Sequence, residues 1–134
     1  MKLLISTEQN AEFKVAIGQD TIDKVKVVKK PYKQSELLLK TINDLLESQS
    51  KELADLTGII VVSGPGAFSA LRIGVTTANA LAYSLNIPVV GVEVDESTKI
   101  EGIWEEGTNL LKNKKKFDMT SVVIPQYGRE PNIS

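Results

Sequence analysis

The stretch GIIVVSGPGAFSALRIGVTTANALAYSLNIPVVGVEV, Gly58 to Val94, decides the fold class. Residues 58–62 are a continuous apolar run, which is typical of a strand covered on both faces. Residues 71–85 are expected to form a helix that ends at Asn86 and Pro88, and residues 88–94 are a second apolar run. A strand, a helix and a strand joined by short loops form a βαβ unit, so we expect the two strands to be parallel.

Upstream of this unit, the apolar pattern predicts three short antiparallel strands and one helix. The expected strands are residues 3–6, 13–17 and 22–28. Residues 34–48, QSELLLKTINDLLES, have apolar side chains at helical spacing, and Ser35 is the expected N-cap. The apolar side of this helix comprises Leu38, Leu39, Ile42, Leu45 and Leu46.

The composition limits the classes of reaction that the chain could catalyse. The chain has 134 residues, 42% hydrophobic content, a formal net charge of -1, and neither cysteine nor histidine. These numbers suit one domain, and they exclude thiolate chemistry and every triad that uses histidine. The first residues, MKLLISTEQN, contain an apolar run too short for a signal peptide, and no run approaches the roughly 20 residues that span a bilayer. We therefore expect a cytoplasmic protein with no membrane contact.

The glycine loop between the first run and its helix has two interpretations. A phosphate-binding loop would use backbone N–H groups, but Pro65 has none, and the lysine of a Walker A loop is absent. Gly64 and Gly66 give only G-x-G-x-x-S, which is a weak dinucleotide signal. Alternatively, the three residues Gly-Pro-Gly form a rigid turn from strand to helix, with Phe68 packing behind it. The second interpretation suits the residues better.

The helix that follows the loop has the pattern of a helix buried on more than one side. Between Ala70 and Leu85, Arg72 is the only charged residue, and small residues form a second stripe beside the large apolar one. One side can cover the sheet, and the small stripe would let another backbone come close. The pattern is consistent with a helix-to-helix interface with another protein or another copy. Burial wholly inside the monomer is the competing interpretation.

The composition changes after Val94, where residues 95–119 are rich in charge and contain apolar anchors for one short helix. Lys112 to Lys116, KNKKK, is the basic cluster of this segment. Such a run is usually a solvated loop or helix end, and a contact with RNA or a protein partner is the alternative. Residues 122–124 are expected to form a strand, and the last residues an extended tail.

Several of these motifs together resemble the TsaB family, the dimerisation subunit of the bacterial tRNA threonylcarbamoyladenosine machinery. The family pattern G-P-G-S-F-T-G-L-R-I-G is matched by residues 64–74, GPGAFSALRIG, and N-I-P-V-V-G-V is matched at residues 86–92. Residues 35–48 resemble the preceding helix of the family, and residues 124–134, IPQYGREPNIS, resemble its C-terminal P-x-Y-x-R-x-P. The resemblance covers residues 1–94 and about the last dozen.

The resemblance implies an α/β, actin-like (ribonuclease-H-like) lobe with a five-stranded mixed sheet and helices on its faces. The family normally carries a second, larger lobe before its C-terminal tail. We therefore expect residues 1–134 to form a single N-terminal lobe, in which the charged segment 95–119 replaces the second lobe. Residues 120–134 would supply a C-terminal strand and tail.

The resemblance also implies a non-catalytic subunit without metal or cofactor. It would bind the catalytic paralogue TsaD, join an assembly with the ATPase TsaE, pair with itself in isolation, and act on tRNA only indirectly. The catalytic paralogue uses histidines for its metal, and this chain has none. The first strand ends Ile5-Ser6-Thr7-Glu8 where the family usually reads I-D-T-S, and Gln34 replaces the usual histidine.

From the resemblance, the two helices are expected to carry the partner or dimer interface, and Gly64, Pro65, Gly66 and Phe68 the structural loop. A nucleotide-binding actin-like domain that uses the Gly-Pro-Gly loop remains the alternative function. A glycoprotease is disfavoured because no nucleophilic or paired-carboxylate motif is present. The expected interface comprises Ser35, Leu38, Leu39, Ile42, Ala70, Arg72, Ile73, Gly74, Thr77, Leu81 and Ser84.

Overall fold

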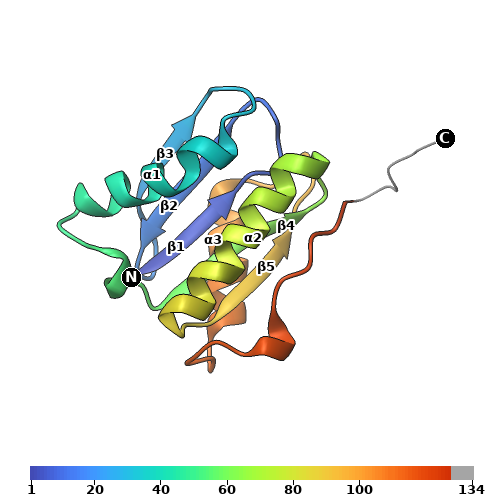
Figure 1. The fold of residues 1–134 in the computed structure, drawn as a ribbon. Helices are drawn as coiled ribbons and strands as arrows, with labels where there is room; N and C mark the ends of the chain where they lie inside the picture. The colour runs from blue at the N-terminus through green and yellow to red at the C-terminus, as the bar shows by residue number, and fades with distance from the viewer. Residues whose placement is uncertain (128–134) are drawn as a thin grey trace.

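A five-stranded mixed sheet forms the centre of the molecule, as Figure 1 shows in a computed structural model that describes residues 1–127. The strand order is β3-β2-β1-β4-β5. β1, β2 and β3 are antiparallel neighbours, and β4 and β5 are parallel to each other, both as the sequence predicted; β4 also pairs in parallel with β1. The strands are β1 (Lys2–Ser6), β2 (Phe13–Gly18), β3 (Ile22–Val28), β4 (Gly58–Gly64) and β5 (Val89–Glu93).

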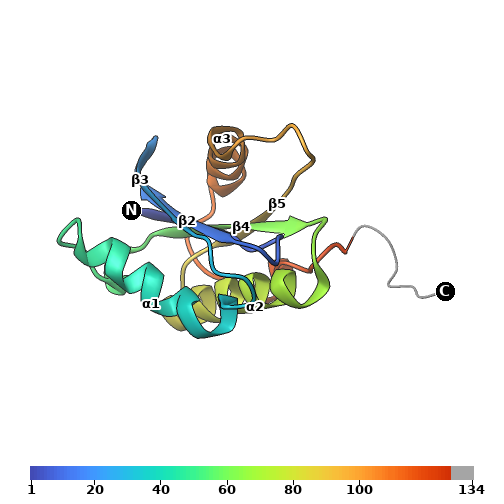
Figure 2. The same cartoon turned by 90° about the horizontal axis from the view of Figure 1, so that it is seen from above.

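Helices cover both faces of the sheet, which confirms the α/β class. Figure 2 shows α1 (Gln34–Glu47) and α2 (Phe68–Leu85) on one face and α3 (Ile100–Leu111) on the other. β4 is buried along its whole length because it has helices on both sides. Ile59 and Val61 pack into the core under α1 and α2, whereas Ile60 and Val62 pack into the core under α3. The apolar run of residues 58–62 is therefore a doubly covered strand.

The start of α1 differs from the expectation that Ser35 caps it. The helix begins at Gln34, the N-cap position is Lys33, and no side chain caps the first turn. The Gln34 amide instead donates to the carbonyl oxygens of Gln9 at 2.8 Å and Asn10 at 3.2 Å. Gln34 is only 2% exposed. A buried glutamine thus joins the helix to the loop after β1, and the side chain of Ser35 is exposed.

The charged segment 95–119 contains α3, which packs against the sheet as part of the same fold. Ile103, Trp104 and Leu111 are buried in the core on this face. The indole Nε1 of Trp104 donates to the carbonyl oxygen of Asp20 at 3.1 Å, which ties the helix to the turn between β2 and β3. The helix has exposed glutamates on its outer side and apolar side chains on its inner side. The expected short helix is confirmed.

The strand expected at residues 122–124 is wrong. Met119–Ser121 is a single 3₁₀ turn, and residues 122–127 follow without regular structure. Asn79 of α2 bonds both backbone groups of Val123, and the Gln126 N–H donates to the Ser63 carbonyl oxygen at 2.6 Å. These partners replace a strand ladder. We call residues 117–127 the C-terminal strap, and the remainder of the expected tail lies outside the described residues.

Leu53–Asp55 forms a 3₁₀ turn between α1 and β4. Among the helices of residues 1–127, none has the length and apolar character needed to cross a membrane.

Candidate protein–protein interface

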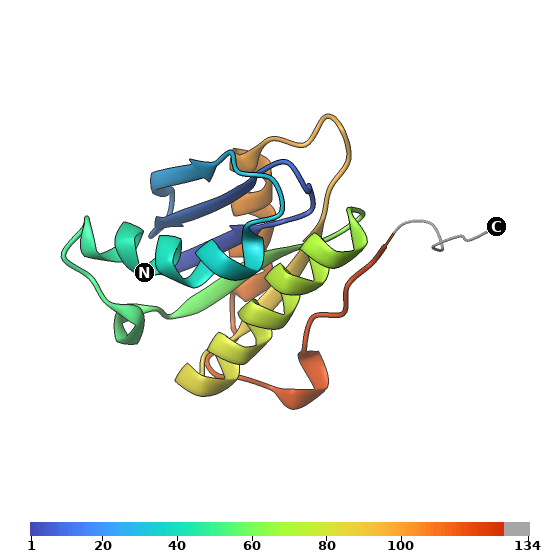
Figure 3. The same ribbon diagram turned by 45° about the horizontal axis from the view of Figure 1, so that its top comes forward.

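α2 lies beside α1 over the sheet, and one of its sides is wholly internal (Figure 3). Gly74 faces the side chain of Thr7, and a Cβ atom there would collide with the threonine hydroxyl. That hydroxyl donates to the Ala70 carbonyl oxygen at 2.7 Å in a buried hydrogen bond. The small residues of this stripe therefore let α2 approach the end of β1. The burial places Ala70 and Gly74 within the monomer and not on an outer surface.

Four of the residues expected at an interface are core residues. Leu38 is 2% exposed and Ile42 is fully buried, because this side of α1 packs on the sheet and on α2. Ala70 and Gly74 are buried as described above. These four residues are therefore buried inside the monomer. Helical periodicity identified an apolar stripe but could not distinguish a stripe that faces the chain's own sheet from one that faces a partner.

The other expected residues remain accessible, and some of them share one shallow groove. Ser35, Leu39, Arg72 and Ser84 are exposed, whereas Ile73, Thr77 and Leu81 are half-buried. The groove lies where the first turn of α1 meets the first half of α2. It is lined by Ser35, Ser69, Arg72, Ile73, Thr76 and Thr77.

Ser69 and Thr76 belong to this groove although the sequence reasoning did not select them. They lie three residues before and four residues after Arg72, so they share its side of the helix. Helical spacing from Arg72 was the signal that could have identified them. The groove has a small, polar lining around one permanently charged guanidinium, with Ile73 as its apolar member. Leu39, Leu81 and Ser84 lie outside it.

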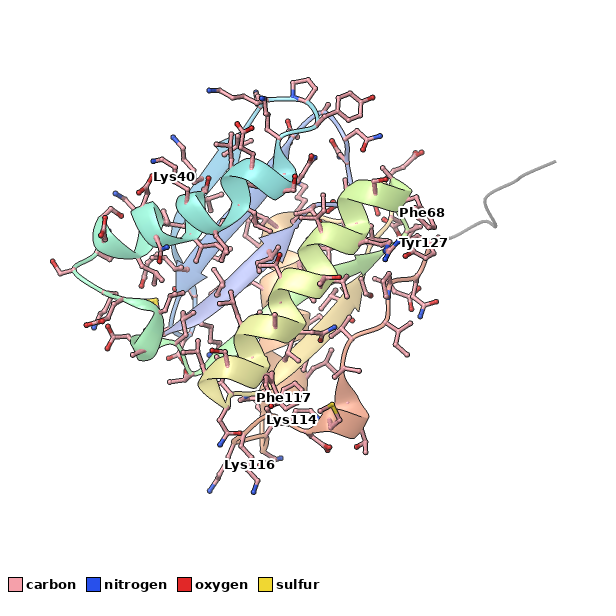
Figure 4. The ribbon with its side chains drawn as sticks, viewed as in Figure 1. Lys40, Phe68, Lys114, Lys116, Phe117 and Tyr127 are labelled. Carbon is pink, nitrogen blue, oxygen red and sulfur yellow. The ribbon has the colours of Figure 1, made fainter. Side chains whose placement is uncertain are left out.

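An aromatic column borders the groove at the start of α2. The rings of Phe68 and Tyr127 stack with their centroids 4.4 Å apart, and Figure 4 shows both side chains at this end of the helix. The guanidinium carbon of Arg72 lies 5.7 Å from the centroid of Phe68. Phe68 is thus half exposed and covered by the strap, and it does not pack behind the loop as expected. The strap reaches the start of α2 through Tyr127.

The Gly-Pro-Gly loop is filled by the chain itself. Gly64 has φ of +139°, and a Cβ atom there would overlap the carbonyl oxygen of Gln126. At Gly66 a Cβ atom would come within 2.6 Å of the Cβ atom and the carbonyl oxygen of Glu8. The Ala67 N–H donates to that same oxygen at 2.8 Å. The glycines therefore allow close approach of two backbone segments, which supports the interpretation of the loop as a structural turn.

The nucleotide alternative gains no support from the carboxyl end of the parallel strands, where the Gly-Pro-Gly turn also lies. Ligands of open α/β sheets bind beyond the carboxyl ends of such strands. Here that position has a small hollow of about 240 Å³ with Glu8, Asp95 and Glu96 in its lining and Lys14 as the basic member. The Ser6 hydroxyl donates to Glu8 at 2.6 Å. Such a surplus of carboxylates would repel a nucleotide's phosphates.

Metal ligation was the remaining possibility at this end of the sheet. Across residues 1–127, no three acidic side chains are grouped closely enough to hold a metal ion. Asp95 instead accepts hydrogen bonds from Ser97 and Thr98, and those bonds, the one from the Ser97 hydroxyl above all, lower the pKa of its carboxyl. Asp95 therefore stabilises its own turn.

Comparison with known proteins assigns the chain to a family. A family model described as "TsaD: tRNA N6-adenosine threonylcarbamoyltransferase" matches residues 29–99, just over half of the chain. The chain belongs to this family. The matched range contains α1, β4, α2 and β5, so it includes both helices of the groove and the Gly-Pro-Gly turn.

Individual relatives refine the placement. A tRNA N6-adenosine threonylcarbamoyltransferase of Geotalea uraniireducens is 40% identical over 65 residues, covering 48% of this chain and 19% of that protein. The tRNA threonylcarbamoyladenosine biosynthesis protein TsaB of Escherichia coli K12 is 27% identical over 103 residues, covering 76% of this chain and 44% of that protein. The solved structure of YeaZ from Pseudomonas aeruginosa superimposes with a TM-score of 0.63 at 27% identity, covering 69% of this chain and 43% of that chain.

The similarity to TsaB and YeaZ extends over more of this chain than the similarity to the transferase. The chain is therefore TsaB-like, and the resemblance found in the motifs and the single actin-like lobe are confirmed. The chain spans less than half the length of each of these relatives.

Proposed function

We propose that this chain is a non-catalytic scaffold subunit of an assembly that transfers a threonylcarbamoyl group to adenosine in tRNA. Its relatives are named for this modification, and the chain is more extensively similar to the biosynthesis protein TsaB than to the transferase. The non-catalytic role is supported by the absence of histidine and cysteine from the sequence. It is also supported by the Gly-Pro-Gly turn, whose space is occupied by Glu8 and Gln126.

We propose that the groove between α1 and α2 is the surface that binds a TsaD-like catalytic subunit. The observation that carries this proposal is the placement of Ser35, Arg72, Ile73 and Thr77 around one accessible depression. Its small side chains let a partner helix approach closely, and Arg72 can form charge-assisted hydrogen bonds with a carboxylate. In the absence of that subunit, the same surface would pair two copies of this chain. A TsaE-like ATPase would join the assembly through the catalytic subunit.

The described residues form one lobe, and we propose that this lobe is sufficient for binding the partner. The proposal follows from the position of the groove, whose lining comes entirely from α1 and α2. Neither α3 nor the segment around it contributes to that surface.

Co-purification of a tagged TsaD-like subunit with this chain tests the interface. Thr76→Arg places a large cation in the groove, and we expect it to abolish capture. Thr21→Arg makes the same change at an exposed position between β2 and β3, on a different part of the molecule, and we expect unchanged capture. Equal capture of the groove variant and the native chain would refute the assignment of the groove. Thermal unfolding of both variants confirms that each one folds.

A further inference from the structure

Three consecutive lysines follow α3 in a defined turn and border a surface hollow. Lys114, Lys115 and Lys116 are exposed and line a hollow of about 560 Å³ together with residues of the strap. Asn113 has φ of 70°, and the Lys114 N–H donates to the Leu111 carbonyl oxygen at 3.0 Å, so the turn begins directly at the helix end. Figure 4 shows Lys114 and Lys116 beside Phe117, at the opposite end of α2 from Phe68.

The hollow carries a surplus of positive charge. Considering the described part of the chain, none of the three ammonium groups forms an ion pair. The acidic residue of the lining is Asp118, whose carboxylate accepts hydrogen bonds from Thr120 and Ser121. The lysines therefore remain available to an external anion, although the whole chain has a net charge of -1.

An exposed aromatic ring lies next to this turn. Tyr83, near the end of α2, is 65% exposed, and its ring meets the ring of Phe117 edge-on with centroids 5.5 Å apart. Phe117 directly follows the three lysines and is half-buried, so it holds Tyr83 in position. Sites for single-stranded nucleic acid combine two components. Basic side chains follow the phosphate backbone, and an aromatic ring beside them stacks on a base.

A second group of exposed lysines lies on and directly after an outermost strand. Lys24 and Lys26 lie on β3, the outermost strand, and Lys29 follows it. Lysines on an outermost strand prevent pairing with other sheets, which is sufficient reason for their presence. They provide a matched comparison of equal charge.

We propose that Lys114, Lys115, Lys116 and Tyr83 form a site for RNA. The ammonium groups contact successive backbone phosphates, and an unpaired base stacks on Tyr83. The choice of RNA over an acidic protein rests on the proposed function, because the relatives are named for modifying tRNA. The site goes beyond that function, because it gives this chain a direct contact with the RNA in place of a purely scaffolding role.

Fluorescence anisotropy of a labelled, unmodified tRNA transcript with the full chain tests the site. The triple variant Lys114→Gln, Lys115→Gln, Lys116→Gln should weaken binding and reduce the slope of log K against log salt by about two, since each lost phosphate contact contributes about 0.7. The control variant Lys24→Gln, Lys26→Gln, Lys29→Gln loses the same three charges and should bind as the native chain does. Tyr83→Ala should weaken binding about 5- to 150-fold, whereas Tyr83→Phe and Tyr32→Ala should not.

Three outcomes would overturn the site. Equal losses in the two triple variants would show only nonspecific attraction, and binding to phosphatidylserine vesicles without binding to the transcript would show a lipid surface instead. Capture of the TsaD-like subunit is measured on the same variants. Loss of RNA binding with retained capture supports the site, and native RNA binding by the lysine variant overturns it while leaving the scaffold proposal intact. Failed capture by the native chain would refute the scaffold proposal without removing the RNA result.

Discussion

Asn79 forms a pair of hydrogen bonds with the backbone of Val123, 44 residues further along the chain. Its Nδ2 donates to the Val123 carbonyl oxygen at 2.9 Å, and the Val123 N–H donates to its Oδ1 at 3.0 Å. A side-chain amide on α2 thus satisfies both backbone groups of one residue in the strap. This arrangement explains why the strap lies along α2 without joining the sheet.

Replacing Asn79 should loosen the strap. Asn79→Ala leaves both backbone groups of Val123 without their partners, which costs about 1–3 kcal/mol when water cannot fully replace them. We expect faster hydrogen exchange at the Val123 and Gln126 amides and a modest fall in the unfolding temperature. Asn43→Ala, at an exposed position on α1, is the matched control and should change neither. Unchanged exchange at Val123 in Asn79→Ala would contradict the role of the pair.

Two glycine-to-alanine substitutions should have opposite effects on stability. At Gly74 a new Cβ would collide with Thr7, so Gly74→Ala should lower the free energy of unfolding by about 1–3 kcal/mol. At Gly102 of α3 nothing lies within 4 Å of the added Cβ, so Gly102→Ala should raise it by up to about 1 kcal/mol. Denaturant unfolding measures both. A neutral or stabilising Gly74→Ala would mean that α2 does not approach Thr7 so closely.

Gln34 should be needed for the junction between α1 and the loop after β1. Gln34→Ala removes the donor to the carbonyl oxygens of Gln9 and Asn10 and leaves a small cavity. We expect a loss of about 1–3 kcal/mol in the free energy of unfolding. Ser35→Ala, one residue later, should have little effect because Ser35 does not cap the helix. A larger effect at Ser35 than at Gln34 would restore the serine as the cap.

Asp118 should titrate below the usual carboxyl range. The hydrogen bond from the Thr120 hydroxyl, followed by that from the Thr120 N–H, lowers its pKa from the ordinary value of 3.8. Because the folded pKa is lowered, the stabilisation of the 3₁₀ turn is present above about pH 3.8 and disappears as the pH falls through the lower folded pKa. NMR titration of the Thr120 amide measures this transition, and Asp118→Asn should remove it. A midpoint at or above 3.8 would be inconsistent with these bonds.

The sheet and its helices could be predicted because their signals are local. The continuous apolar run at residues 58–62, the alternation in β2 and the helix stops at Asn86 and Pro88 each follow from short-range patterns. The predictions were wrong where contacts between residues far apart in the sequence determine the local structure. Gln34 is held by a loop 25 residues away, and the strand expected at residues 122–124 is replaced by bonds to Asn79 and Ser63.

At the candidate interface, too, local patterns were informative and contacts between distant residues could not be predicted. Spacing selected two helices as the candidate interface, and the structure brings Ser35 and Arg72 of these helices to one groove. The sequence could not show which stripe of each helix faces outward, because Leu38 and Ala70 have the same apolar character in a core as in an interface. The aromatic column of Phe68 and Tyr127 joins residues 59 positions apart, so no local pattern predicts it.

The strap also determines what another molecule can recognise on α2. The helix is enclosed by the sheet, by α1 and by residues 117–127, so its accessible side has borders that come from separate parts of the chain. A partner that binds this side therefore contacts several segments that come together only after folding is complete. A peptide with the sequence of α2 should be a poor competitor, and assembly would select correctly folded copies of the chain.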